Sequence, residues 1–177
     1  MRCFVSIDIP DELRQKIINL QKELPEGAAC TRPETLHFTL KFLGDVDDTR
    51  SIVKKLSFLR ERNSFQICLA GAGAFPSEKS ARIVWIGAES QELINLQKSV
   101  EKALGQENEK FVPHITIARI KHTSPDLPEF IQKNRHTEIG EMRAFCVKLK
   151  KSELLRSGAV YTDIEIFELI SAETKGF

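Results

Sequence analysis

The chain has 177 residues, of which 41% are hydrophobic and 29% are charged, a balance typical of a folded globular protein. This length suffices for one ordinary core or for two small lobes that share an interface, so we expect one domain over residues 1–177. The 26 Lys and Arg against 25 Asp and Glu leave a formal charge of +1, which excludes a global field that attracts nucleic acid or membranes. Any contact with nucleic acid must therefore be local.

The N-terminal segment and the cysteines indicate the compartment. The apolar run in MRCFVSIDIPDE ends at a proline and two acidic residues before it reaches the length of a signal-peptide core. No stretch approaches the roughly 18 apolar residues that a membrane span needs. The four cysteines have no C-x-x-C spacing, which favours free thiols over disulfides or a zinc site. We therefore expect a cytoplasmic protein with no membrane partner.

The first half of the chain predicts an alternation of strands and helices. Apolar residues alternate in some segments, as in half-buried strands, and recur at helical spacing in others. The strands are predicted at 1–9, 36–43, 65–69 and 82–86. The helices are predicted to begin at Pro10 and near Asp48.

The second half repeats this order. A helix that Ser90 can cap is followed by a strand over 113–120, a weaker helix over 128–134, and strands near 142–149 and 161–169. Because helix, histidine-containing strand, helix and strand occur twice, an internal duplication is the economical explanation. No Gly-rich strand-to-helix turn is present, so we predict an α+β fold with two mainly antiparallel sheets rather than a doubly wound parallel sheet.

Two of the predicted strands carry the same short motif, in the strings LHFTL and PHITI. Since side chains alternate across a strand, His37 and Thr39 share the face opposite the apolar one, and His114 and Thr116 do the same. A single His-x-Thr has negligible specificity. Two copies on the polar face of alternating strands, each at the same place in a repeat, are much harder to attribute to chance.

Two imidazoles and two hydroxyls in one cleft suit phosphodiester chemistry. An imidazole titrates near pH 6.5, so one histidine can accept a proton from water while the other, protonated, donates to the leaving alkoxide. The threonine hydroxyls can donate hydrogen bonds to the nonbridging phosphate oxygens. This scheme needs no metal ion.

Other kinds of site have less support. Neither motif strand has a second His, Cys, Asp or Glu at ligand spacing beside its histidine, so no metal site is predicted. No Gly-x-Ser-x-Gly elbow supports a serine hydrolase, and no Walker-type loop suggests a need for ATP or another cofactor. His122 and His136 lie in polar segments without an alternating apolar face, and we interpret them as surface residues.

Five strings occur in a characteristic order, namely RCFVSIDIP, LHFTLKFLG, FPS ahead of RIVWIG, FVPHITIAR and SELLRSGAVY. On these strings, nearly the whole chain resembles the RNA 2′,3′-cyclic phosphodiesterases, also called 2′-5′ RNA ligases, of the two-histidine phosphoesterase superfamily. The resemblance implies a two-lobed α+β fold with a central cleft lined by both motifs. It also implies hydrolysis of a 2′,3′-cyclic phosphate at an RNA end to a 2′-phosphomonoester, with reverse 2′-5′ ligation in the same site.

The resemblance assigns roles to five residues. His37 is expected to be the proton donor and His114 the proton acceptor, with Thr39 and Thr116 holding the phosphate. The family also tends to use an arginine five residues after the second histidine, and Arg119 stands there.

The alternation of side chains bears on Arg119 and Lys41, and two aromatic residues are further candidates. In a regular strand Arg119 lies on the apolar face, so it reaches the cleft only through a bulge or where the strand ends. Lys41 has the spacing for the cleft face, and a solvated lysine at a sheet edge is an equal alternative. Phe75 and Tyr161 can stack on a nucleobase, but a core phenylalanine and an end-of-strand tyrosine are commoner, so the predicted site leaves both out.

The motif residues leave alternatives open. They are compatible with a phosphodiesterase that acts on small cyclic nucleotides or an ADP-ribose cyclic phosphate, and a non-catalytic module that binds RNA ends is a different class again. The expected partner is RNA with a 2′,3′-cyclic phosphate end, tRNA fragments included, and the expected state is a monomer. Arg32 and Lys110, in loops before the motif strands, are interpreted as ordinary loop charges.

Overall fold

The computed structural model describes residues 1–31, 33–105, 111–122, 124–156 and 158–171. Its elements, in chain order, are β1 (Arg2–Asp8), α1 (Asp11–Gln21), β2 (Ala28–Cys30), η1 (Pro33–Thr35), β3 (His37–Asp45), α2 (Thr49–Lys55), η2 (Ser57–Glu61), β4 (Phe65–Phe75), β5 (Ile83–Glu89), α3 (Gln91–Leu104), β6 (His114–Ile120), α4 (Leu127–Lys133), β7 (Glu138–Ala144), β8 (Cys146–Leu155) and β9 (Gly158–Glu168).

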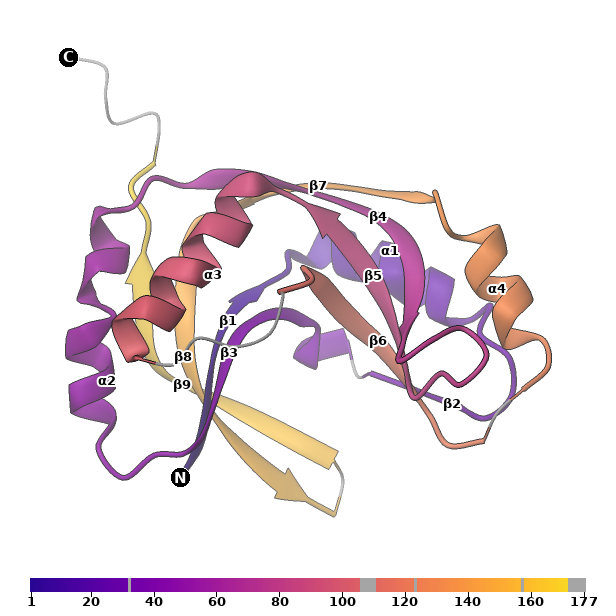
Figure 1. Cartoon of the computed structure of the whole chain (residues 1–177), viewed down its shortest axis with the longest axis horizontal. Helices are drawn as coiled ribbons and strands as arrows, with labels where there is room; N and C mark the ends of the chain where they lie inside the picture. Colours follow the sequence, from indigo (N-terminus) through magenta and orange to yellow (C-terminus); the bar gives the residue numbers. More distant parts are fainter. Residues whose placement is uncertain (32, 106–110, 123, 157, 172–177) are drawn as a thin grey trace.

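The strands form one antiparallel sheet in the order β7-β4-β5-β6-β3-β1-β8-β9, with β2 beside β6. The central strands β3 and β6 share a single register pair, Phe38 opposite Ile115, which we call the seam. Beyond the seam the two strands diverge, and β2 pairs with the end of β6. The sheet curls into a first lobe (β1, β3, β8, β9) and a second lobe (β4, β5, β6, β7), as Figure 1 shows. The predicted α+β fold with two mainly antiparallel lobes is confirmed, and the two predicted sheets are continuous through the seam.

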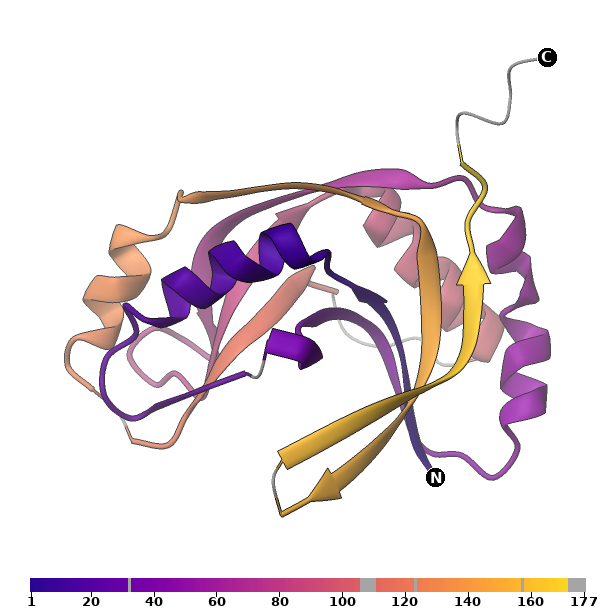
Figure 2. The ribbon, with the colours of Figure 1, turned by 180° about the vertical axis from the view of Figure 1, so that it is seen from behind.

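The helices are exchanged between the two halves of the chain. Helix α1 follows β1 of the first lobe but packs against β6 and β7 of the second, where Leu13 approaches Gly140. Helix α3 follows β5 of the second lobe but extends to β3 and α2 of the first. Figures 1 and 2 show α1 and α4 together at one end of the molecule and α2 and α3 at the other. Buried residues from both lobes consequently belong to one apolar core.

Side-chain caps fix where two helices begin. The Ser90 hydroxyl accepts a hydrogen bond from the backbone N–H of Leu93, and α3 ends at Gly105, which has a φ of 72°. The Asp48 carboxylate accepts from the backbone N–H groups of Arg50 and Ser51 at the start of α2. Both starts agree with the prediction from sequence.

The segment 142–149 differs from the prediction of one strand. It contains the end of β7 and the start of β8, separated by Phe145, which is 56% exposed. Strand β7 pairs with β4 in the second lobe, whereas β8 pairs with β1 in the first. The chain passes from one lobe to the other without a glycine or proline, so the sequence carries no turn signal at this point.

The cysteines are all free thiols, with Cys3 buried, Cys30 exposed and Cys68 and Cys146 in between. Within the described part of the chain, no helix combines the length and the apolar character required to cross a membrane.

Candidate active site

A β-bulge in β6 decides where Arg119 points. The pairing of β6 with β5 skips Ile117, so the alternation of side chains reverses after this residue. Ile117 and Ala118 are consecutive buried residues, and Arg119 is exposed on the polar face. There it lines the same cleft as His114 and Thr116. The bulge that Arg119 needs in order to reach the cleft is present.

The same bulge occurs in β3, where the pairing with β1 skips Leu40. It turns Lys41 into the core, contrary to the alternation of a regular strand, and the Lys41 Nζ lies 3.2 Å from a carboxylate oxygen of Glu101. Phe42 takes the position on the cleft face that Arg119 has in the second copy, and it is 68% exposed. Sequence reasoning missed Phe42. The available signal was its spacing, because Phe42 and Arg119 each stand five residues after a motif histidine.

The two motif strands line one cleft of about 470 Å³ beside the seam. All five residues of the predicted site are among those that line it, namely His37, Thr39, His114, Thr116 and Arg119. Tyr161 lines the same cleft, whereas His122 and His136 are not among its lining residues. Arg32 and Lys110 lie outside the described residues.

Both motif histidines are held in the same way by the backbone. The Nδ1 of His37 lies 2.6 Å from the carbonyl oxygen of Thr35, and the Nδ1 of His114 lies 2.7 Å from that of Val112. Because a carbonyl oxygen only accepts hydrogen bonds, Nδ1 carries the proton and donates in each ring. Each Nε2 is thereby left to exchange protons, and that of His37 lies 3.0 Å from the Thr39 hydroxyl oxygen.

Aromatic rings flank each motif histidine. The His37 ring centroid lies 5.0 Å from that of Phe4 and 5.4 Å from that of Tyr161, which it meets edge-on. The second motif histidine lies 5.1 Å from Phe75, also edge-on, and 6.3 Å from Trp85. Such packing restricts rotation of the imidazoles, so Phe75 and Tyr161 orient the histidines in the absence of substrate.

A network of four charged side chains lies beside His37. Asp8 stands opposite His37 in the register of β1 and β3. Its carboxylate is 2.9 Å from the Lys148 Nζ and 3.0 Å from the Lys150 Nζ. The Asp163 carboxylate lies 2.8 Å from each of the same two lysines. The second motif histidine has no equivalent network among the described residues, because the glycine Gly87 occupies the register position of Asp8.

This environment shifts the pKa of His37 downward. Burial is the largest cause, and the positive charge of Lys150 acts in the same direction. The hydrogen bond to the Thr35 carbonyl and the negative charge of Asp8 raise the pKa, but they offset only part of the effect of burial. The neutral form of His37 is therefore favoured in the free protein.

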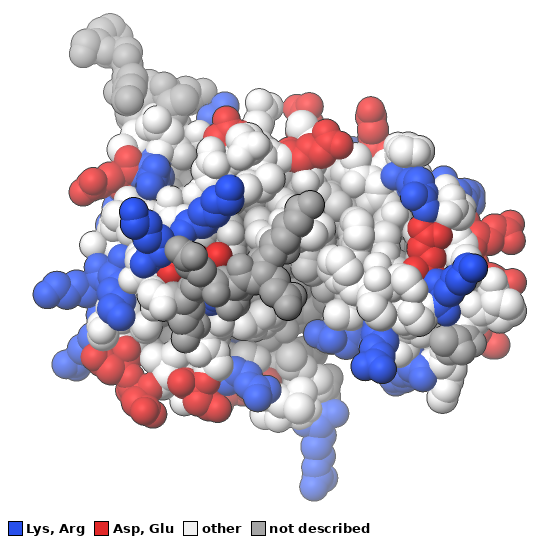
Figure 3. Space-filling model, viewed as in Figure 1, with Lys and Arg blue, Asp and Glu red and all other residues white. Residues whose placement is uncertain are grey.

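The cleft opens into two regions of different character. On one side of the motif residues it continues along β2 to Lys121 and Arg156, and we call this side, with Arg119, the cationic region. On the other side Thr39, His114, Thr116 and Arg119 also border a hollow that we call the aromatic region, lined by Phe42, Phe75, Ile83, Phe111 and Val112. A phosphate held between the histidines is thus adjacent to both regions. Figure 3 shows how Lys and Arg side chains are distributed over this face of the molecule.

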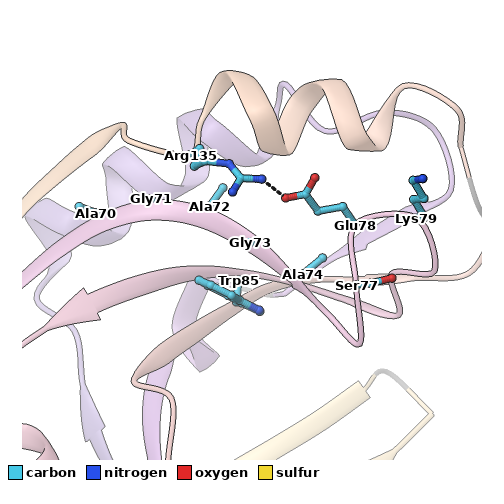
Figure 4. Close-up of a pocket in the computed structure, with 10 residues that line it drawn as sticks. All are labelled: Ala70, Gly71, Ala72, Gly73, Ala74, Ser77, Glu78, Lys79, Trp85 and Arg135. Carbon is cyan, nitrogen blue, oxygen red and sulfur yellow. Dashed lines mark hydrogen bonds and ion pairs between the residues drawn. The ribbon is translucent and has the colours of Figure 1, made fainter.

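A separate pocket of about 710 Å³ lies between β4, the loop after it and the end of α4 (Figure 4). Arg135 points toward Glu78 and forms an ion pair with it, and the Gln132 amide donates to the same carboxylate at 2.8 Å. Trp85 borders this pocket, but neither motif histidine lines it. No histidine is among the described residues that line this pocket, and its Glu78 carboxylate is paired with Arg135, so the pocket does not offer the two imidazoles of the cleft.

Among the residues that the structure describes, no group of three or more His, Cys, Asp or Glu side chains is arranged to hold a metal ion. Two imidazoles line the cleft, and imidazole is the side-chain group that ordinarily titrates near neutral pH.

Comparisons with known proteins agree with this geometry. The model of the family described as LigT like Phosphoesterase matches the chain twice, over residues 7–85 and 86–161. The RNA 2′,3′-cyclic phosphodiesterase of Archaeoglobus fulgidus is 38% identical, over 95% of this chain and 100% of its own. The crystal structure of TT0787 from Thermus thermophilus matches with a TM-score of 0.82 and 28% identity, over 97% of this chain and 100% of that one. Escherichia coli LigT in complex with 3′-AMP has a TM-score of 0.75 and 28% identity, over 95% and 97% of the two chains.

Proposed function

Because the chain belongs to the LigT-like phosphoesterase family, we propose that it hydrolyses the 2′,3′-cyclic phosphate ends of RNA to 2′-phosphomonoesters. The observation that carries this proposal is the pair of motif histidines, each with Nδ1 bonded to a backbone carbonyl and both in one cleft. The relatives named RNA 2′,3′-cyclic phosphodiesterase and the complex of E. coli LigT with 3′-AMP support RNA as the substrate.

The proposed reaction is a single displacement at phosphorus. His114 Nε2 accepts a proton from water as the water oxygen forms its bond to phosphorus. His37 Nε2–H donates its proton to the 3′ oxygen as the bond from that oxygen to phosphorus breaks, which leaves the phosphate on the 2′ oxygen. Thr39, Thr116 and Arg119 stabilise the charge on the nonbridging oxygens. When the 5′-hydroxyl of a second RNA end replaces water as the nucleophile, the same groups join the two ends through a 2′-5′ linkage, with the 3′ oxygen again as the leaving group.

The protonation of His37 couples to substrate binding in this scheme. The acid role needs the imidazolium, whereas burial lowers the pKa of His37 in the free protein. A bound phosphodiester places a negative charge beside the ring and favours the protonated form. Since kcat/KM reports the free enzyme, it is expected to fall as pH rises through the pKa of free His37, below the ordinary value of about 6.5.

A direct test uses an RNA oligonucleotide with a 2′,3′-cyclic phosphate end, in excess chelator, with separation of the 2′- and 3′-phosphate products. Wild type is expected to form the 2′-phosphate, and His37→Ala and His114→Ala are each expected to lose about 10²–10⁴ in rate. His122→Ala is the matched control, because His122 is exposed and does not line the cleft. Unchanged conversion by the two motif variants, or formation of the 3′-phosphate, would contradict the proposal.

We further propose that residues 1–177 form one domain that arose by duplication. The two matches to the same family model support this, as do the equal bulges after Thr39 and Thr116.

We also propose that the protein acts as a cytoplasmic monomer and that tRNA fragments are among its substrates. Sedimentation of the purified protein tests whether it is a monomer. Sequencing of cyclic-phosphate RNA ends in cells with and without the protein tests whether tRNA fragments are among its substrates.

A further inference from the structure

The C-terminal hairpin extends beyond the rest of the sheet. Strands β8 and β9 pair along their whole length, from Cys146 and Glu168 to Leu155 and Gly158. Strand β1 covers the other edge of β8 only over 148–151. The remaining ribbon, residues 152–156 and 158–161, projects away from the body in both views (Figures 1 and 2), and we call it the arm.

One face of the arm belongs to the cleft. Residues opposite each other in an antiparallel pair point to the same side, and residues two apart in a strand do so as well. Leu154 stands opposite Ala159, and Tyr161 follows two residues later. Ala159 and Tyr161 line the cleft, and the Tyr161 ring packs edge-on against His37. Leu154 is therefore on the cleft side, where it is 83% exposed, while Leu155 points to the outer side.

Cations line both walls of the cationic region. Arg156 lies at the tip of the arm, and Arg119 and Lys121 lie at the end of β6 on the opposite wall. All three side chains are exposed, and no Asp or Glu is among the described residues that line this cleft. Figure 3 shows Lys and Arg side chains at the tip of the arm and on the neighbouring edge of the body. In a chain with a formal charge of only +1, this concentration of positive charge is local and suits a polyanion.

We propose that the arm binds the RNA strand that leads up to the cyclic phosphate, so that several nucleotides are recognised rather than the terminal one alone. This inference rests on the proposed function, since it extends the same site. Arg156 contacts a phosphodiester of the strand across from Arg119 and Lys121. Leu154 packs against a ribose or a base, which removes its exposed surface from water.

The arrangement favours RNA over a protein partner as the occupant of the arm. An apolar patch alone fits many partners, but here Leu154 stands opposite Ala159, which lines the cleft, and precedes Arg156 by two residues. The positive lining is also continuous with the residues proposed to hold the reacting phosphate. A single strand whose last phosphate lies between the histidines must leave the cleft along one of its two regions. Beyond Arg119, which borders both regions, the aromatic region offers apolar residues and the ion-paired Lys41 and Glu101, whereas the cationic region matches the charge of the RNA backbone.

The test compares kcat/KM for two substrates, a 2′,3′-cyclic mononucleotide and an RNA of roughly ten nucleotides that ends in a cyclic phosphate. Wild type is expected to favour the RNA. Arg156→Ala and Leu154→Ala are each expected to lower kcat/KM for the RNA by about fivefold, the effect of one solvent-exposed contact, and to leave the mononucleotide unchanged. With the RNA, the salt dependence of log kcat/KM in Arg156→Ala is expected to be shallower by about 0.7, because one phosphate contact is lost.

Two matched controls separate binding from folding. Leu155→Ala alters the outer face of the same ribbon, and Arg50→Ala removes an exposed arginine from α2. For both control variants, kcat/KM for each of the two substrates is expected to equal that of wild type. Equal losses on both substrates, equal effects of Leu154→Ala and Leu155→Ala, or unchanged RNA hydrolysis in the arm variants would overturn the inference. If wild type hydrolyses neither substrate, the proposed function itself fails, which is a different outcome.

Discussion

His37 and His114 are oriented by the same backbone contact, but the residues around them differ. Each ring donates from Nδ1 to the carbonyl oxygen two residues earlier in the chain. Aromatic rings flank both imidazoles, but among the described residues only the first ring lies beside a charged network, that of Asp8 and Lys150. The repeated strand thus fixes the geometry of both imidazoles. Burial, together with the charge of Lys150, a neighbour that is not repeated, lowers the pKa of His37, so in the proposed reaction its role as the acid depends on the phosphodiester that favours the protonated ring.

The position five residues after each histidine extends this comparison. The bulge brings Phe42 to the cleft in the first lobe and Arg119 to the cleft in the second. A symmetric backbone consequently presents an aromatic side chain on one wall and a cation on the other. For the substrate proposed above, this difference favours one of the two orientations that the backbone symmetry allows.

The largest effects on the rate are expected from substitution of the two histidines. A substrate whose leaving group needs no proton distinguishes the acid from the base. In a nucleoside 2′-(p-nitrophenyl phosphate), the aryl oxygen replaces the 3′ oxygen as leaving group and needs no proton. His37→Ala is therefore expected to recover most of its loss of about 10²–10⁴ on this substrate, and His114→Ala to recover none. The measurement is kcat for both variants on both substrates. Equal recovery would mean that acid and base are not divided between the two lobes as proposed.

The next effect concerns the two side chains that the bulges expose. Arg119→Ala is expected to lower kcat about 10²-fold, because one donor to the developing charge is lost. Arg119→Lys restores part of the rate, since it keeps the charge. Phe42→Ala is expected to raise KM about tenfold instead, because a stacked base contributes about 1–3 kcal/mol to binding. If both variants changed the same kinetic constant by the same factor, the two walls would not differ in function.

The residue that the first bulge turns into the core differs from the one at the second bulge. The free energy of unfolding is expected to report this difference. Lys41 is buried beside Glu101, whereas Ala118 holds the equivalent place in β6. Lys41→Met is expected to lower the free energy of unfolding by about 3–5 kcal/mol, because it leaves the buried Glu101 carboxylate without this cation. The double variant with Glu101→Met is expected to recover most of the loss. Urea denaturation of the three proteins checks this, and a double variant no more stable than Lys41→Met would contradict it.

The smallest expected effect is a shift in the pH profile. The negative charge of Asp8 raises the pKa of His37, so Asp8→Asn lowers that pKa and moves the alkaline limb of kcat/KM to lower pH. The positive charge of Lys150 lowers the same pKa, so Lys150→Met moves the limb to higher pH. Profiles of kcat/KM against pH for wild type and both variants test the two directions. Shifts of the same sign would show that the limb does not report His37.

The sequence predicts the faces of the strands well and their irregularities poorly. The alternation in LHFTL and PHITI is enough to place four of the site residues on the polar faces of two strands. It does not place Lys41, Phe42 or Arg119, because a bulge adds one residue without changing the composition of the strand. The bulges follow from pairing with β1 and β5, which lie far away in the chain.

Local periodicity does not show which lobe an element joins. The apolar stripe of α1 predicts a helix with one buried face, but this face covers strands β6 and β7 of the second lobe. The change of lobe at Phe145 is hidden for the same reason, since β7 and β8 each have a buried face of their own. The local sequence pattern determines which side chains of an element are buried. The pairing of strands that are distant in the chain determines which other elements those side chains pack against.

The exchanged helices make the two histidine strands interdependent. A chain cut in the loop between β4 and β5 gives two fragments, each of which contains one complete His-x-Thr strand. The first fragment keeps α1 but lacks β6 and β7, against which α1 packs, and the second keeps α3 but lacks β3. Neither fragment can bury its own helix, so assembly of the imidazole pair becomes a bimolecular reaction. Activity regained on mixing such fragments would depend on their concentration, as in an obligate heterodimer.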